Sequence, residues 1–232
     1  MGRFRCAGAA LLLWGAGMAE PKIIENASDN DIADWLSGRI ARALDSTQGR
    51  VRIALPGGST PFPILSILVG RDHDWGRITV VPTDDRDVPE DHAASNTGKL
   101  RALFEPVGAR VEALSNDATD DATISDRFAL VWLGMGGDGH IASLFPNTDP
   151  QIDDPKPLRR ITPDPLPPEA PFDRLTLTLP TLLDTDEIVL VIRGEDKREV
   201  FDAALRREHD LPIARLLWGN AKGAARPVTC FT

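Results

Sequence analysis

Short runs of consecutive hydrophobic residues recur along the chain, separated by stretches in which hydrophobic positions return every three or four residues. A run with few polar positions is typical of a strand that is covered on both faces. Such runs predict strands at 51–55, 78–82, 127–134, 187–192 and 227–231. A further run, 174–180, alternates hydrophobic and polar residues and predicts a half-buried strand.

The stretches with helical spacing predict the helices. Residues 28–46 place hydrophobic side chains on one face behind Ser28 or Asp29, which are suitable N-cap residues. Further helices are predicted at 62–70, 95–104 and 195–208. Because strands and helices alternate, the sequence predicts a single α/β domain with a parallel-rich sheet flanked by helices. The stretches 146–157 and 162–173 are rich in proline and aspartate and predict surface loops.

Composition narrows the range of ligands. The 232 residues suffice for one domain with a sizeable core, and 26 Lys and Arg residues against 35 Asp and Glu residues give a net charge of −9. A surface of this charge repels nucleic acids and anionic membranes, and no hydrophobic stretch reaches the length of a membrane span. An acidic protein that binds an anion must therefore gather positive charge in one place.

Neither disulfides nor metal sites are indicated. Cys6 and Cys230 lie near opposite ends of the chain and form no Cys-x-x-Cys pair. The histidines His73, His92 and His209 lack the spacing of metal ligands and lie in charged segments. The sequence therefore predicts no bound metal.

The segment GMGGDGHIASLFP, residues 134–146, follows a predicted strand and contains the Gly-x-Gly-x-x-Gly spacing of dinucleotide-binding loops. Pro146 ends any helix within a turn or two, and the Asp138 carboxylate would repel a pyrophosphate, so no nucleotide cofactor is expected. The segment instead offers Asp138 and His140, and an imidazole is suited to general-base catalysis near neutral pH. A structural alternative is that Asp138 caps a short helix that begins near His140.

A second loop with adjacent glycines, PGGSTP, also follows a predicted strand. Its glycines permit backbone amides to turn toward an anion, and its hydroxyls add donors at a helix N-terminus. The residues predicted to bind the anion are Gly57, Gly58, Ser59 and Thr60. The loop also approaches the Gly-x-Ser-x-Gly motif of serine hydrolases, with Ser59 as nucleophile and His140 as base. Pro61 stands where that motif has its last glycine, which argues against this alternative.

Two basic side chains follow other predicted strands. Arg86 lies in TDDRDVP and Lys197 in RGEDK. The carboxyl ends of parallel strands meet at one edge of a sheet, so both cations can reach an anion held by residues 57–60. A single basic residue is usually a solvated surface residue, but three loops that favour the same ligand indicate a phosphate site.

Together these segments resemble the 6-phosphogluconolactonase family. GMGGDGHIASLFP is similar to the signature of that family, ALPGGSTP and TDDRDVPEDHAASN to its two upstream motifs, and VIRGEDKREV to its downstream motif. Their order and approximate spacing agree from about Ile23 to the C-terminus. The resemblance implies the fold shared with glucosamine-6-phosphate deaminase and ribose-5-phosphate isomerase. It also implies hydrolysis of 6-phosphoglucono-1,5-lactone to 6-phosphogluconate in the pentose phosphate pathway.

The resemblance further implies roles for individual residues. His140 would be the general base that activates water, with Asp84 and Asp138 at the site. Arg86 and Lys197 would bind the 6-phosphate together with the loop at residues 57–60. A lactone is an activated ester, so amides of the glycine loop would suffice to stabilise the oxyanion without a metal or a cofactor. The loop residues expected to do so are Gly136, Gly137 and Gly139.

The sequence departs from the family pattern in three places. Asp85 stands where the family more often has Glu, and Asn147 where Gly is common after SLFP. Residues 105–128 are short and lack the amphipathic helix expected before the next strand, so we expect one helix to be reduced to a loop. None of these changes affects the expected base or the two cations.

Two related functions are alternatives. A glucosamine-6-phosphate deaminase typically has a Tyr after the paired acids and a Phe-Asn-Glu-Pro run after the His, whereas this chain has no Tyr and reads SLFP. A non-catalytic sugar-phosphate sensor of the same fold usually carries a DNA-binding domain, and none is expected from this sequence. The expected partner is a sugar phosphate lactone, bound by a monomer or a small homo-oligomer.

The N-terminal residues 1–17 allow two interpretations. Arg3 and Arg5, a short hydrophobic run and small residues around Ala19 fit a secretory signal peptide. Alternatively, the protein begins at Met18 and the preceding residues are an extension from gene prediction. The function implied by the resemblance favours a catalytic domain at residues 18–232 in a cytoplasmic protein.

Overall fold

The computed structural model describes residues 21–115, 127–219 and 226–232, except residues 167 and 169. The expected N-terminal extension at residues 1–17 lies outside this part of the chain. In the described part, no helix is long and apolar enough to cross a membrane.

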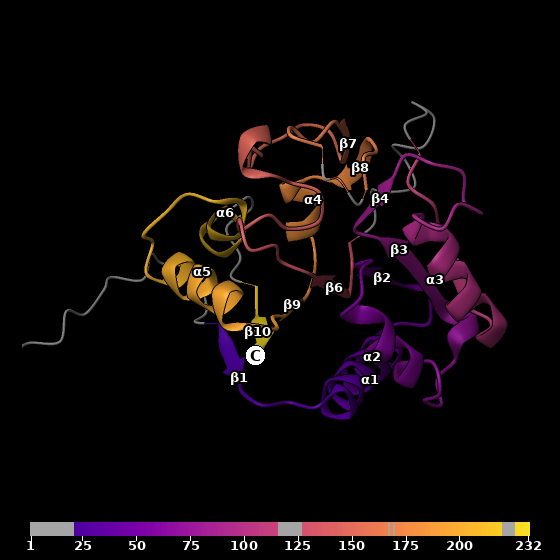
Figure 1. Cartoon of the computed structure of the whole chain (residues 1–232). Coiled ribbons are helices and arrows are strands. Elements are labelled where there is room, and N and C mark those ends of the chain that lie inside the picture. Colours follow the sequence, from indigo (N-terminus) through magenta and orange to yellow (C-terminus); the bar gives the residue numbers. More distant parts are fainter. Residues whose placement is uncertain (1–20, 116–126, 167, 169, 220–225) are drawn as a thin grey trace, which may run out of the picture.

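A seven-stranded sheet in which every pair is parallel forms the centre of the molecule (Figure 1). All five strands predicted from hydrophobic runs belong to this sheet, so the predicted parallel-rich sheet is confirmed. The short edge strands β1 and β5 were not predicted, because two or three residues give no pattern. In spatial order the strands are β1 (Lys22–Ile24), β10 (Val228–Phe231), β9 (Ile188–Val191), β6 (Leu130–Leu133), β2 (Val51–Leu55), β3 (Ile78–Pro82) and β5 (Arg110–Val111).

The four predicted helices are confirmed. The α-helices in the described residues are α1 (Asp29–Ser46), α2 (Pro61–Leu68), α3 (Asn96–Phe104), α4 (Leu179–Leu183), α5 (Glu195–Leu205) and α6 (Pro212–Trp218). Ser28 caps α1, because its hydroxyl accepts from the Asp31 amide while the Asp31 carboxylate accepts from the Ser28 amide. Helices α4 and α6 were not predicted, since one or two turns show too little periodicity.

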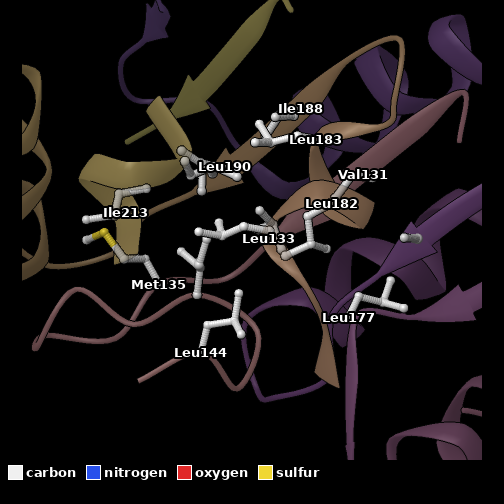
Figure 2. Close-up of a cluster of buried hydrophobic side chains, with 14 of the residues drawn as sticks. Val131, Leu133, Met135, Leu144, Leu177, Leu182, Leu183, Ile188, Leu190 and Ile213 are labelled. Atoms are coloured by element: carbon white, nitrogen blue, oxygen red, sulfur yellow. The ribbon is translucent and has the colours of Figure 1, made fainter. Parts of the chain in front are cut away.

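Two hydrophobic cores cover the two faces of the sheet. Helices α1, α2 and α3 pack on one face, and α4, α5 and α6 pack on the other. Successive strand residues point to opposite faces, so β6 contributes Trp132 to the first core and Val131 and Leu133 to the second (Figure 2). Both faces are therefore covered, which explains why the central strands are mostly hydrophobic.

A second, antiparallel sheet stands beside the central one. Its strands are β4 (Asp84–Arg86), β8 (Arg174–Leu177) and β7 (Leu158–Ile161). The prediction that β8 is half-buried was wrong, because all four of its residues are buried. Its polar residues have internal partners: Arg174 donates to the carbonyls of Phe172 and Ala170, and the Thr176 hydroxyl accepts from the Ser143 amide. The alternating pattern therefore marked hydrogen-bonding positions rather than positions exposed to solvent.

The segment expected to lose a helix is only partly described. Residues 105–115 contain a short 3₁₀ helix, Glu105–Val107, followed by β5. Residues 116–126 of the same expectation lie outside the described part of the chain.

Asp85 joins β4 to the N-terminus of α3. It is 5% exposed, and its two carboxylate oxygens accept hydrogen bonds from three backbone amides and two hydroxyls. The donors are the amides of Arg86, Asn96 and Thr97 and the hydroxyls of Ser95 and Thr97. The departure from Glu at this position therefore falls on a residue that anchors a helix. Its negative charge also complements the N-terminal end of the helix dipole.

Replacing Asp85 by Ala should lower the free energy of unfolding by more than about 2 kcal/mol, because it leaves several buried donors unpaired. Urea denaturation measures this change. The control is Asp87→Ala, which removes an exposed ion pair with Arg160 and should cost less than about 1 kcal/mol. Equal stabilities of the two variants would contradict the anchoring role.

Candidate active site

A cavity of about 280 Å³ lies where the strand order changes direction. Strand β2 has β3 on one side and β6 on the other, and such a switch point opens a crevice at the carboxyl ends of the strands. The loops that follow β2, β3, β6 and β9 line the cavity. The predicted site residues that it brings together are Gly57, Gly58, Ser59, Thr60, Asp84, Arg86, Gly136, His140 and Lys197.

The other predicted site residues lie next to this cavity rather than in its wall. Gly137 and Asp138 line a second cavity of about 470 Å³, which Phe145 also borders. His140 lines both cavities. Gly139 is buried behind them and packs against Leu211. The imidazole is thus the group that the two cavities share.

Asp138 and His140 form a hydrogen-bonded pair. The Asp138 Oδ1 atom is 2.6 Å from His140 Nδ1 and also accepts from the His140 amide at 3.2 Å. The hydrogen bond from His140 lowers the pKa of the Asp138 carboxyl, which is therefore ionised at neutral pH. An ionised carboxylate only accepts, so the proton of this hydrogen bond is on Nδ1, and Nε2 is the ring nitrogen that takes no part in the pair.

Glycine at position 136 leaves room for the imidazole. A Cβ atom at Gly136 would lie 2.2 Å from the Cε1 and Nδ1 atoms of His140, which is far inside van der Waals contact. Gly139 adopts a positive φ of 77°. The alternative that Asp138 caps a short helix near His140 was wrong, because residues 140–145 form turns and isolated β-bridges. The carboxylate instead holds the imidazole.

Two amides of the glycine loop are used inside the loop. The Gly136 amide donates to the His140 carbonyl at 2.9 Å, and the Gly139 amide donates to the Gly136 carbonyl at 3.1 Å. These two groups are therefore not available to an oxyanion in this structure. Within the described residues, the Gly137 amide has no such partner.

The loop that follows β2 has hydroxyls and glycines where an anion could bind. A Cβ atom at Gly57 would lie 1.9 Å from Asn96 Oδ1, and Gly58 has a positive φ of 99°. Thr60 is the N-cap of α2, but its side chain makes no capping hydrogen bond. In the described part of the chain, no hydrogen bond joins Ser59 to His140, so a serine-hydrolase triad is not assembled.

Three basic residues, two Arg and one Lys, are among the described residues that line the cavity. Arg86 is fixed through Nη1, which donates to the Ala94 carbonyl at 2.8 Å and to Asn96 Oδ1 at 3.2 Å. Lys197 lies in the first turn of α5 and forms no ion pair with any residue that the structure describes. The third is Arg193, at the end of β9. Sequence reasoning missed Arg193, although it stands in the RGEDK segment that contains Lys197.

Asp84 provides a carboxylate among the described residues that line the cavity. Burial raises the pKa of its side chain, while a hydrogen bond from the Ser143 hydroxyl and the charge of Arg86 act in the opposite direction. Ser143 and Asn96 were also missed. Both stand inside recognised motifs, but only their contacts in the fold reveal their part in the site.

Among the described residues, no cluster of three or more His, Cys, Asp or Glu could hold a metal ion.

Asn147, the second departure from the family pattern, joins two loops. Its amide Nδ2 donates to the Asp164 carbonyl, and both residues border the second cavity. A glycine at this position would lack that contact.

The fold and the cavity define an α/β protein that gathers its positive charge at the carboxyl edge of a parallel sheet. A family model described as "Glucosamine-6-phosphate isomerases/6-phosphogluconolactonase" matches residues 25–224. The chain therefore belongs to this family, in agreement with the resemblance carried by its motifs.

Individual relatives agree with the family. A protein of Pseudomonas aeruginosa named 6-phosphogluconolactonase is 33% identical over 230 residues, which cover 91% of this chain and 92% of that protein. A protein of Mesorhizobium japonicum with the same name is 36% identical over 216 residues, which cover 86% of this chain and 88% of that protein.

Solved structures support the fold. A 6-phosphogluconolactonase from Shewanella baltica superimposes with a TM-score of 0.77 at 24% identity, covering 93% of this chain and all of that one. A monomeric glucosamine-6-phosphate deaminase superimposes with a TM-score of 0.70 at 18% identity, covering 90% of this chain and 96% of that one. The fold is thus common to both activities and does not by itself choose between them.

Removing the imidazole should change the titration of its partner. In His140→Ala, the pKa of the Asp138 carboxyl should rise toward its ordinary value, because the hydrogen bond that lowers it is lost. Carboxyl ¹³C NMR titration measures this change. The pKa of Asp31 serves as the control, since the contact that lowers it comes from Ser28. An unchanged Asp138 titration would show that the pair does not form in solution.

Proposed function

We propose that this protein hydrolyses 6-phospho-D-glucono-1,5-lactone to 6-phospho-D-gluconate. The observation that carries the proposal is that His140, held by Asp138, lines the same cavity as Arg86 and Lys197. An oriented imidazole and a pair of cations are the groups needed to direct water to a phosphorylated ester. The relatives in P. aeruginosa and M. japonicum, both named 6-phosphogluconolactonase, support this substrate.

His140 is the proposed general base. Its Nε2 atom takes a proton from the water that attacks the lactone carbonyl carbon, and Asp138 stabilises the imidazolium that forms. The same nitrogen then returns the proton to the ring oxygen when the bond between that oxygen and the carbonyl carbon breaks. His140 therefore ends the reaction in the protonation state in which it began. The step needs neither a covalent intermediate nor a redox partner.

The oxyanion donor proposed from the glycine loop is the Gly137 amide. The amides of Gly136 and Gly139 are occupied within the loop, so their part in the mechanism is to shape it around His140. Gly137 and His140 line the same cavity, which supports binding of the reacting end of the lactone beside them.

Arg86 and Lys197 are the proposed partners of the 6-phosphate. The hydroxyls of Ser59 and Thr60 and the permissive glycines Gly57 and Gly58 line the cavity with them. Binding of the phosphate, which does not react, orients the lactone over His140. Because Asp138 is engaged with His140, Asp84 is the carboxylate left to contact sugar hydroxyls.

Replacing His140 by Ala should lower kcat by about 10²–10⁴-fold, the usual contribution of a general base. The measurement is the rate of lactone disappearance above spontaneous hydrolysis, with a chelator present. His73→Ala is the control, because His73 bonds Ser37 and does not line the cavity, and it should keep full activity.

Either of two results would overturn the proposal. Loss of wild-type activity in chelator would contradict hydrolysis without a metal. A wild-type protein that binds the sugar phosphate but adds nothing to the background rate would be a sensor rather than a lactonase.

Arg86→Ala should raise KM about tenfold or more with a smaller change in kcat, because a charge-assisted hydrogen bond to the phosphate is lost. Steady-state kinetics separates the two constants. Arg160→Ala provides the matched control, since that arginine pairs with Asp87 and Asp173 and does not line the cavity. A normal KM in Arg86→Ala would refute the phosphate assignment.

A further inference from the structure

Arg193 is a cation of the cavity that the proposed mechanism does not use. It lies two residues after the end of β9 and precedes Gly194, whose positive φ of 99° turns the chain into α5. Arg193 lines the same cavity as Arg86 and Lys197. The three cations therefore reach the cavity from β4, from the end of β9 and from the first turn of α5.

One nitrogen of Arg193 is engaged by the chain. Its Nη2 donates to the Ala27 carbonyl and to Asp29 Oδ1, both at 3.2 Å. Asp29 lies in the first turn of α1, so these contacts tether the guanidinium to the start of that helix. Within the described residues, its Nη1 and Nε have no partner. The guanidinium is thus held at one side and keeps donors for a ligand.

The charges in the cavity indicate what that ligand is. Among the described residues that line it, Asp84 is the only carboxylate and its pKa is raised by burial, whereas three side chains are basic. This excess of positive charge occurs in a protein with a net charge of −9. A phosphate monoester carries about −1.5 to −2 charges near neutral pH, and Arg is well suited to bind it. A neutral sugar lactone carries no negative charge to balance these three cations.

We propose that Arg193 is a specificity-determining residue that donates from Nη1 to the substrate phosphate, beside Arg86 and Lys197. It thereby raises the preference of the enzyme for phosphorylated over unphosphorylated lactone. The identity of the ligand rests on the proposed function, but the phosphate contact can be measured without turnover.

A purely structural role makes a different prediction. If Arg193 only joined β9 to α1 through Asp29, its loss would lower stability and reduce activity on both lactones by the same factor. A contact to the phosphate affects one substrate and leaves the other unchanged.

The experiment compares Arg193→Ala, Arg193→Lys and Arg198→Ala with the wild type. Arg198 is the matched control, because it is a neighbouring arginine that pairs with Asp202 and Glu25 outside the cavity. Kinetics are measured on 6-phosphogluconolactone and on glucono-1,5-lactone, and calorimetry measures the Kd for inorganic phosphate.

Arg193→Ala should lower kcat/KM for the phosphorylated lactone about tenfold, mainly through KM, and weaken phosphate binding by a similar factor. Its kcat/KM for glucono-1,5-lactone should not change. Arg193→Lys should recover part of the loss because it keeps the charge. Arg198→Ala should resemble the wild type in every measurement.

Equal losses on both lactones, or phosphate binding unchanged in Arg193→Ala, would overturn the inference. If the wild type hydrolyses neither lactone but binds phosphate and Arg193→Ala binds it more weakly, the proposed function fails and the phosphate contact stands. If hydrolysis proceeds normally in Arg193→Ala, only the contact fails.

Discussion

Parallel pairing of β2 with both β3 and β6 is the constraint on which the site depends. In a parallel sheet all strands deliver their following loops to the same edge, and the change of direction at β2 separates those loops enough to open a cavity. Residues far apart in the chain, such as Gly57, Arg86, His140 and Lys197, meet there for this reason. The two hydrophobic cores hold the strands in this arrangement. The positions of the residues that line the cavity therefore depend on side-chain packing outside the cavity.

Two of the glycines are needed because another side chain lies close to their backbone, not because they make the chain flexible. The imidazole of His140 occupies the space that a side chain at Gly136 would fill, and the amide of Asn96 occupies the space at Gly57. Asn96 also accepts from Arg86, so the second contact helps to position a cation. The base therefore lies directly against a backbone position without a Cβ atom, and the cation is held by a side chain that lies against another.

Two aspartates of the site have opposite electrostatic environments. Asp138 has a lowered pKa because it accepts a hydrogen bond from His140, whereas burial raises the pKa of Asp84. A third carboxylate, Asp85, is enclosed by donors and anchors α3. The adjacent residues Asp84 and Asp85 therefore have different roles, because successive side chains of β4 point to opposite sides of the strand. The residue types alone do not distinguish them.

Hydrophobic periodicity and local motifs were enough to predict the parallel sheet, four of the helices and the candidate residues Asp84, Arg86, His140 and Lys197, because both report local structure. The folded structure was needed to show that 174–177 is a buried strand, that Asp138 holds the imidazole instead of capping a helix, and that Arg193 lines the cavity with the other two cations. The buried strand and the meeting of the three cations depend on contacts between segments distant in the chain, and such contacts leave no periodic trace in either segment. The hydrogen-bonding partners of a polar residue, unlike its polarity, exist only once the fold has formed.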